Sequence, residues 1–87
     1  MDGDERVRED GSWLINGDIP VEDIKKILSV DSFPGEDKSH YRTIAGLILF
    51  ILERIPKTGD YIEVAGLRYE VVDMDGKRVD KVLVIKG

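Results

Sequence analysis

Apolar residues recur along the chain at two spacings, and the change between them predicts the order of the elements. Short runs at residues 6–9 and 12–16 favour two strands. Apolar residues three and four positions apart then predict one helix over 20–29 and a second that begins at 43 or 44 and ends at 55. Three further strand-like runs follow in the order YIEV, LRYEVVDM and KVLVIK. The predicted order is two strands, two helices and three strands.

Residues that favour turns and helix ends separate these runs. The Asp-Gly pairs at 10–11 and 75–76 are typical of tight hairpins. Thr43 is a good N-cap for the second helix, and Pro56 is expected to end it. Within 67–74 the apolar residues change from one face of the strand to the other, which predicts a β-bulge or a strand covered on both faces.

This pattern predicts an α+β fold: an antiparallel sheet of four to five strands, built from both ends of the chain, with two helices packed on it. The 87 residues are enough for one domain. Residues 1–6 are expected to form a polar lead-in or linker, and residues 7–87 a single domain.

The second predicted helix carries more apolar surface than one packed face needs. A stripe sufficient for packing on a sheet is formed by Ile44, Ile48, Ile51, Leu52 and Ile55. Leu47, Leu49 and Phe50 extend the apolar surface around most of the rest, so that this helix must be covered on most sides. Two explanations stay open: the loop over 30–42 folds onto the second face, or a partner chain or neighbouring domain covers it. Leu47, Leu49 and Phe50 are therefore the candidate interface residues.

Composition and charge narrow the classes of function. The net charge is −5 and there is no basic stripe, which argues against nucleic acid and anionic membranes as partners. The chain has no Cys, so a disulfide framework and thiolate metal sites are excluded. The longest apolar run, over 44–52, is far shorter than the roughly 20 residues of a membrane-spanning helix. The N-terminus lacks the pattern of a signal peptide, and the chain is expected to be soluble.

No residue pattern indicates an enzyme, a metal site or a cofactor site. His40 is the single His, and no GxSxG, GxGxxG or P-loop motif occurs. The run Asp73 to Gly76 resembles part of a calcium loop, but the end positions of such a loop would be Val71 and Val82, which have no oxygen ligands in their side chains. We therefore expect no catalytic residues, no metal and no cofactor.

Several short motifs, in order, resemble the CorC/HlyC transporter-associated domain. They are Asp10, Gly11 and Ser12; Asn16 and Gly17; Thr43 and Gly46; Ile55, Pro56, Gly59 and Asp60; and Asp75 and Gly76. The chain departs from the pattern of this family at two places. Trp13 stands where the family more often has Tyr or Phe, and Ser39-His40 stands where the residues before the Thr are usually acidic. The resemblance covers about residues 7 to 85.

The resemblance implies a function that the spacing of residues does not show. Such domains lie at the cytoplasmic C-terminus of membrane proteins linked to magnesium and cobalt efflux, some of them labelled hemolysin. The implied partners are CBS domains and the membrane domain of the same longer chain, with a homodimer as a further arrangement. The implied role is non-catalytic regulation of transport. The fold is similar to a subdomain of FAD-binding domains of the vanillyl-alcohol oxidase type. An alternative is therefore a nucleotide- or flavin-binding sensor module, with Trp13 and the loop over 29–42 as its platform.

Overall fold

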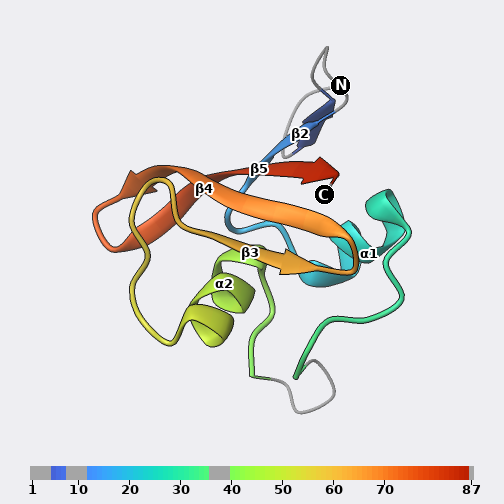
Figure 1. The fold of residues 1–87 in the computed structure, drawn as a ribbon, viewed down its shortest axis with the longest axis horizontal. Helices are drawn as coiled ribbons and strands as arrows, with labels where there is room; N and C mark the ends of the chain where they lie inside the picture. The colour runs from blue at the N-terminus through green and yellow to red at the C-terminus, as the bar shows by residue number, and fades with distance from the viewer. Residues whose placement is uncertain (1–4, 8–11, 36–39, 87) are drawn as a thin grey trace.

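The computed structural model describes residues 5–7, 12–35 and 40–86. Their elements follow the predicted order of two strands, two helices and three strands (Figure 1). In chain order they are β1 (Glu5–Val7), β2 (Trp13–Asn16), α1 (Val21–Leu28), α2 (Ile44–Leu52), β3 (Tyr61–Val64), β4 (Leu67–Asp75) and β5 (Arg78–Lys86).

All five strands belong to one antiparallel sheet with the order β1-β2-β5-β4-β3. The early strand β2 pairs with the last strand β5, with Ile15 opposite Val82. This confirms the prediction that the sheet is built from both ends of the chain. The chain leaves the sheet after β2, forms both helices, and returns at the far edge as β3.

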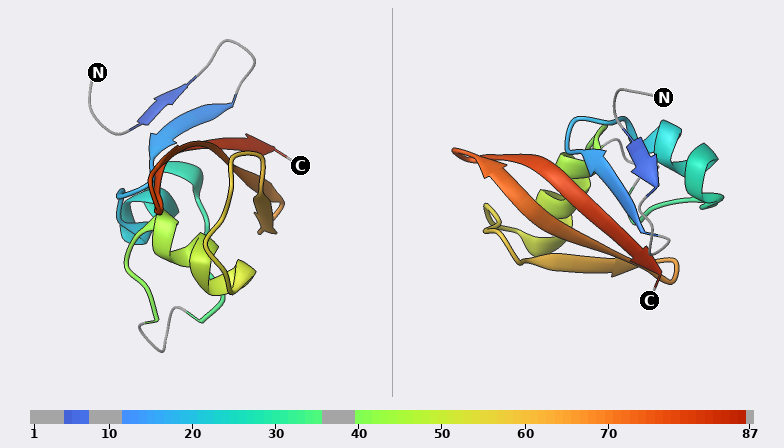
Figure 2. Two further views of the ribbon diagram at one scale, coloured as in Figure 1. Left: turned by 90° about the vertical axis from the view of Figure 1, so that its left-hand side faces the viewer. Right: turned by 90° about the horizontal axis from the view of Figure 1, so that it is seen from above.

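The helices lie on one face of the sheet, so the domain has two layers (Figures 1 and 2). Alternation of side chains along each strand decides which residues meet the helices. Ile15, Tyr69 and Val82 face the helices and are fully buried or nearly so, whereas their neighbours Leu14 and Leu83 face the other side and are half-buried. The core therefore lies between the sheet and α1 and α2.

Two hairpins connect the last three strands. Ala65 and Gly66 form a two-residue turn in which both residues have positive φ, as the favoured tight hairpin turn requires. At the second hairpin, Asp75 pairs with Arg78. The predicted Asp-Gly hairpin at 75–76 is thus confirmed, while the pair at 10–11 lies outside the described residues. The predicted bulge is also confirmed, because the register shifts after Val71.

The second helix is shorter than predicted. It begins after Thr43, whose side-chain oxygen accepts a hydrogen bond from the Gly46 N–H at 3.2 Å, so the predicted N-cap is correct. It ends at Leu52 rather than at residue 55. Glu53 takes a left-handed conformation, with φ of 59°, and its N–H donates to the Leu49 carbonyl at 2.8 Å. This closes the helix three residues before the predicted end.

Two strand boundaries also differ from prediction. β1 begins at Glu5, inside the segment expected to be a lead-in, because pairing with β2 extends to Ile15. β5 begins at Arg78 rather than at residue 81, because the tight hairpin places polar residues in the pairing. In both cases cross-strand pairing continues beyond the apolar run from which the strand was predicted.

Candidate functional site

The structure separates the three candidate interface residues on α2. Leu47 has no exposed surface and packs in the core with Ile44 and Ile48, so its assignment to the outer face was wrong. The physical reason is helical spacing: positions 44, 47 and 48 are three and four residues apart and share one face. Leu49 is half-buried and Phe50 is exposed. Only these two residues remain candidates for an outer contact.

The loop before α2 covers part of the helix. The His40 ring stacks on the Phe50 ring at 4.8 Å between centroids, and the Tyr41 ring lies 5.4 Å from it. The Tyr41 hydroxyl donates to the Pro34 carbonyl oxygen, and Phe33 is buried in the core. The loop thus folds onto the second face, as the first of the two sequence explanations stated.

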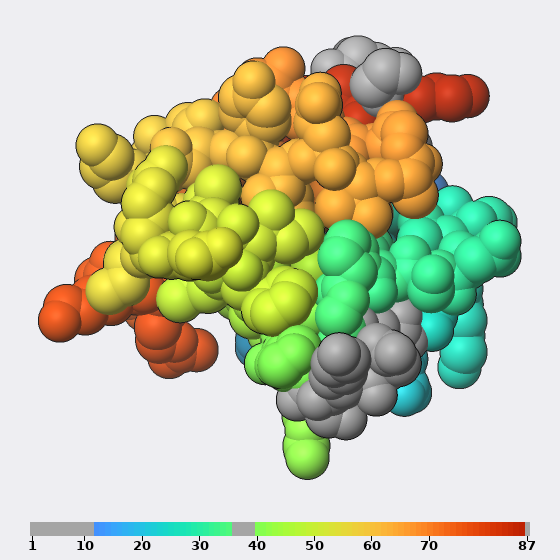
Figure 3. All heavy atoms as spheres, turned by 60° about the horizontal axis from the view of Figure 1, so that its bottom comes forward, coloured from blue at the N-terminus to red at the C-terminus, as the bar shows by residue number. Residues whose placement is uncertain are grey.

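The loop does not cover this face completely. The side chain of Phe50 remains 37% exposed although two rings contact it, and Ile55 beyond the helix is 47% exposed. In Figure 3 the helix lies at the centre of one face of the molecule, between the strands above it and the loop beside it. We call Leu49 and Phe50 the α2 surface.

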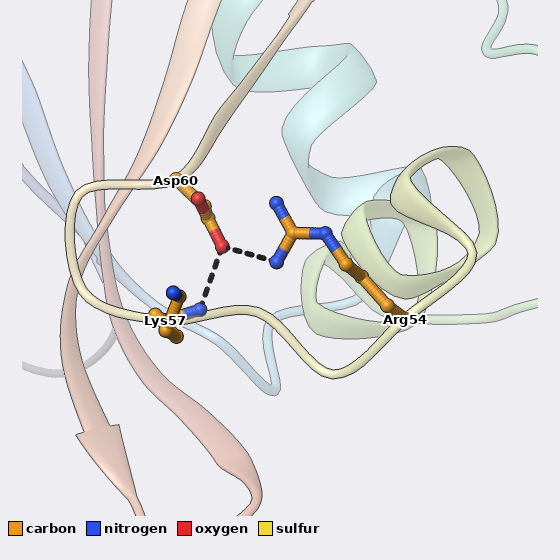
Figure 4. A network of polar contacts seen from close by, with 3 residues as sticks. All are labelled: Arg54, Lys57 and Asp60. Carbon is orange, nitrogen blue, oxygen red and sulfur yellow. Dashed lines mark hydrogen bonds and ion pairs between the residues drawn. The ribbon is translucent and has the colours of Figure 1, made fainter.

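A polar network holds the segment that follows α2. The Arg54 guanidinium donates to the Asp60 carboxylate at 2.7 Å, and the Lys57 backbone N–H donates to the same oxygen at 2.8 Å (Figure 4). The hydrogen bond from Arg54, with that from Lys57, lowers the pKa of Asp60 to about 2. The carboxylate therefore stays ionised at neutral pH and joins the end of α2 to the start of β3.

A second exposed feature escaped the sequence analysis. Tyr61, at the start of β3, is 46% exposed, and the Arg68 guanidinium carbon lies 3.9 Å from the centre of its ring. A nitrogen of the same guanidinium lies 3.7 Å from a carboxylate oxygen of Glu70. Alternation in the run YIEV indicates that Tyr61 and Glu63 face away from the core. It does not show that β3 is an edge strand, which depends on strand order.

A cleft lies beside the loop that follows α1. It has a volume of about 550 Å³ and lies between the end of α1 and the β3–β4 turn, with Asp31 and Lys86 as its charged lining residues. The lining includes residues 29–32 of the loop proposed as a ligand platform but not Trp13, which packs against the core. The two parts of the predicted platform therefore do not meet in this cleft.

The described residues do not assemble a recognisable chemical site. Within residues 5–7, 12–35 and 40–86, no three His, Cys, Asp or Glu side chains lie close enough together to hold a metal ion. His40 is exposed and contacts an aromatic ring. In the same part of the chain, neither helix is long and apolar enough to cross a bilayer. The prominent exposed features are surfaces suited to contact.

The fold is that of a small α+β domain with two helices on one face of an antiparallel sheet. The profile of the CorC_HlyC transporter associated domain matches residues 6–87, and the chain belongs to this family. The predicted resemblance is confirmed. The family name assigns an accessory, transporter-associated role to such domains.

Known proteins of similar sequence are much longer. A UPF0053 protein of Synechocystis sp. is 47% identical over 77 residues, which cover 88% of this chain and 17% of that protein. The Polyamine export protein of Escherichia coli is 42% identical over 79 residues, 91% of this chain and again 17% of the relative. The chain therefore spans about a sixth of the length of these relatives.

A solved structure matches the whole domain. The CorC_HlyC domain of a Xylella fastidiosa hemolysin has a TM-score of 0.84 and 38% identity, and the match covers 99% of this chain and 98% of that one. The α+β architecture is therefore shared along the full length of both domains. The solved chain consists almost entirely of this domain.

Proposed function

We propose that this chain is a non-catalytic regulatory domain on the cytoplasmic side of a transporter-like membrane protein. It acts by docking its α2 surface, Leu49 and Phe50, against the CBS domains of the same longer chain. The observation that carries the proposal is the incomplete cover of α2: Phe50 remains 37% exposed with two rings already packed on it. An exposed aromatic side chain at a packed, partly desolvated position is typical of contact residues.

The length of the relatives supports a partner within the same polypeptide. Their matched segments are 17% of each chain, which leaves most of the protein to supply a neighbouring domain. A tethered neighbour has a high effective concentration, so that a small contact is sufficient. Docking regulates transport only if the contact differs between two states of the transporter.

The cargo in this proposal is a divalent cation, magnesium or cobalt. The CorC_HlyC domain of the Xylella fastidiosa hemolysin has been solved in complex with Mg++ and Mn++. The relative in Escherichia coli is named a Polyamine export protein, and polyamines are also cations. Efflux measured on the full-length protein, with magnesium, cobalt and spermidine as separate cargoes, distinguishes the two classes. Export of spermidine without either metal would overturn the divalent-cation assignment.

The docking proposal is tested by binding between the 87-residue domain and the CBS fragment of the full-length protein. We expect Phe50→Asp to weaken binding at least about tenfold, because a charge replaces an aromatic ring that docking would bury. Phe50→Leu should keep most of the affinity. Tyr61→Asp is the matched control, since it places the same charge at another exposed aromatic residue, on β3. Equal affinities for Phe50→Asp and the unchanged domain would refute docking through α2.

The cleft of about 550 Å³ favours one alternative, a nucleotide- or flavin-binding sensor module. Trp13 is half-buried, so its fluorescence reports changes near β2. Titration with FAD, AMP and ATP tests the alternative. A saturable change that Lys86→Glu abolishes would support it, because Lys86 lines the cleft. Because Trp13 lies outside the cleft, the same titrations are also followed by calorimetry, and no heat of binding at millimolar ligand would remove the alternative.

A further inference from the structure

Strand β3 forms an edge of the sheet that is short and carries Glu63, but it lacks the proline, basic residues and bulges that protect many other edges. It is last in the strand order, and no described strand pairs with its outer side (Figure 2). Tyr61–Val64 contains no Pro, Lys or Arg, and its pairing with β4 runs without a register shift. Natural proteins usually protect edges with such residues or with bulges, because a bare edge recruits another strand.

The hydrogen-bond pattern shows which backbone groups this edge presents. Val64 and Leu67 flank a two-residue turn, so their backbone groups face each other. The Asp60 carbonyl accepts from the Val71 N–H at 2.8 Å, which directs the N–H of the next residue away from β4. Direction alternates along a strand. The N–H and C=O groups of Tyr61 and Glu63 therefore point outward.

We infer that β3 pairs antiparallel with β3 of a second copy of this chain, with the two-fold axis at Ile62. This register places Tyr61 of each copy opposite Glu63 of the other, so that their outward N–H and C=O groups form hydrogen bonds across the axis. A register centred on Glu63 would set two carboxylates opposite each other, which is unfavourable. A register centred on Tyr61 would pair Glu63 with a residue before the strand.

Across this two-fold axis, the side chains of one copy carry charges opposite to those that they meet on the other copy. Arg68 holds its guanidinium over the Tyr61 ring at 3.9 Å, which brings a positive charge to the edge. Directly opposed side chains in an antiparallel pair have Cβ atoms about 5 Å apart. Glu63 of one copy thus reaches Arg68 of the other, and the symmetric contact forms as well. Arg68 of the same chain is the partner of Glu63 across the β3–β4 pair, but its guanidinium lies over the Tyr61 ring instead. Within the described part of the chain, no ion pair involves Glu63.

This inference goes beyond the proposed docking, because it concerns the β3 backbone rather than the α2 surface. The contact is small, so we expect a weak dimer that forms between micromolar and millimolar concentration. Its first test is amide hydrogen exchange by NMR across that concentration range. The Tyr61 and Glu63 amides should gain protection as concentration rises, while the Ile62 and Val64 amides, bonded to β4, stay protected throughout.

Sedimentation equilibrium of charge variants provides the second test. Glu63→Lys should weaken the dimer about tenfold, since two symmetric ion pairs become repulsive contacts. Arg68→Glu should have a similar effect. A mixture of the two variants should dimerise again, because each copy then meets an opposite charge. Glu22→Lys, the same charge change at an exposed position of α1, is the control and should leave the dimer unchanged.

Each outcome decides for or against the edge pairing. A monomer at millimolar concentration overturns it, and so does a dimer in which the Tyr61 and Glu63 amides exchange freely. The exchange experiment uses the unchanged protein, so a variant that fails to fold does not block it. Loss of CBS binding in Phe50→Asp bears only on the docking proposal, and exchange at Tyr61 and Glu63 bears only on the dimer.

Discussion

Replacement of Tyr69 by Phe is expected to stabilise the domain. Tyr69 is fully buried near the start of β4, and its hydroxyl has no hydrogen-bond partner within the described part of the chain. Burial also raises the pKa of Tyr69 to about 12. A polar group removed from water without a partner costs free energy on folding, and Phe avoids that cost while it keeps the ring.

The size of the effect follows from what the substitution keeps and removes. An unpaired buried polar group costs about 1–3 kcal/mol. The edge-to-face contact between Phe33 and the Tyr69 ring, 6.1 Å between centroids, survives in the variant. A small void at the hydroxyl position offsets part of the gain. We expect the free energy of unfolding to rise by about 1 kcal/mol, which raises Tm by about 4–8 °C in a domain of this size.

A second tyrosine provides the matched control. Tyr41 is also buried, but its hydroxyl donates to the Pro34 carbonyl. Tyr41→Phe removes the same atom and leaves that carbonyl without its partner, so it should destabilise the domain by about 1 kcal/mol. Two chemically identical changes are therefore expected to have opposite signs. A general effect of hydroxyl removal cannot produce this difference.

Urea and thermal denaturation of the unchanged protein, Tyr69→Phe and Tyr41→Phe measure the two changes in stability. The same measurements at alkaline pH test the role of the Tyr69 hydroxyl further. The pKa of Tyr69 is 10.0 in a free side chain and about 12 in the fold, so the unfolded state loses its proton first. The contribution of protonated Tyr69 to the free energy of unfolding is fully present below pH 10 and is lost as pH rises to about 12. Tyr69→Phe should lack this loss. A lower Tm for Tyr69→Phe than for the unchanged protein at neutral pH would refute the reasoning.

Three further predictions concern the connections between elements. Thr43→Ala should lower the free energy of unfolding by about 1 kcal/mol in urea denaturation, because it removes the α2 cap. Arg54 lowers the pKa of Asp60 from 3.8 to about 2, so this contribution to stability is present above pH 3.8 and is lost as pH falls to about 2. Asp60→Asn should flatten the acid limb of a pH series of thermal denaturation. Gly17→Ala should cost about 3 kcal/mol or more, since a Cβ there would lie 2.1 Å from the Val79 carbonyl oxygen. A Gly17→Ala protein with unchanged Tm would contradict the close packing of β2 on β5.

Local chemistry made most of the elements predictable. The order of strands and helices follows from a change between two spacings of apolar residues, and hairpins follow from pairs such as Asp75-Gly76. The change of face within β4 correctly indicated the bulge, because a strand can move apolar residues to the other face only by adding a residue. Strand ends were less predictable. At Glu5 and Arg78 pairing with the neighbouring strand, through Ile15 and Asp75, extends a strand into polar residues that its own apolar pattern does not include.

The face of α2 that contacts the core depends on a loop with no periodic pattern. The apolar residues of this helix surround most of its axis, so several stripes satisfy the same spacing. In the structure Leu47 lies in the core, and the loop residues His40 and Tyr41 contact Phe50 of the helix. Local sequence cannot decide between stripes when a loop supplies part of the cover. Phe50 remains a candidate contact residue because it is still exposed although the loop packs on it.

The two proposed contacts differ in how much of each is encoded locally. The α2 surface consists of side chains, so its residue types are visible in the sequence even though their exposure is not. The β3 edge consists of backbone groups, which every residue carries, and it exists only because β5 pairs with β2 and β4 and leaves β3 outermost. Its side chains Tyr61, Glu63 and Arg68 become complementary only in one register of a symmetric pair. Hydrogen exchange at outward amides is therefore the decisive measurement for the edge, whereas substitution of Phe50 is decisive for the helix.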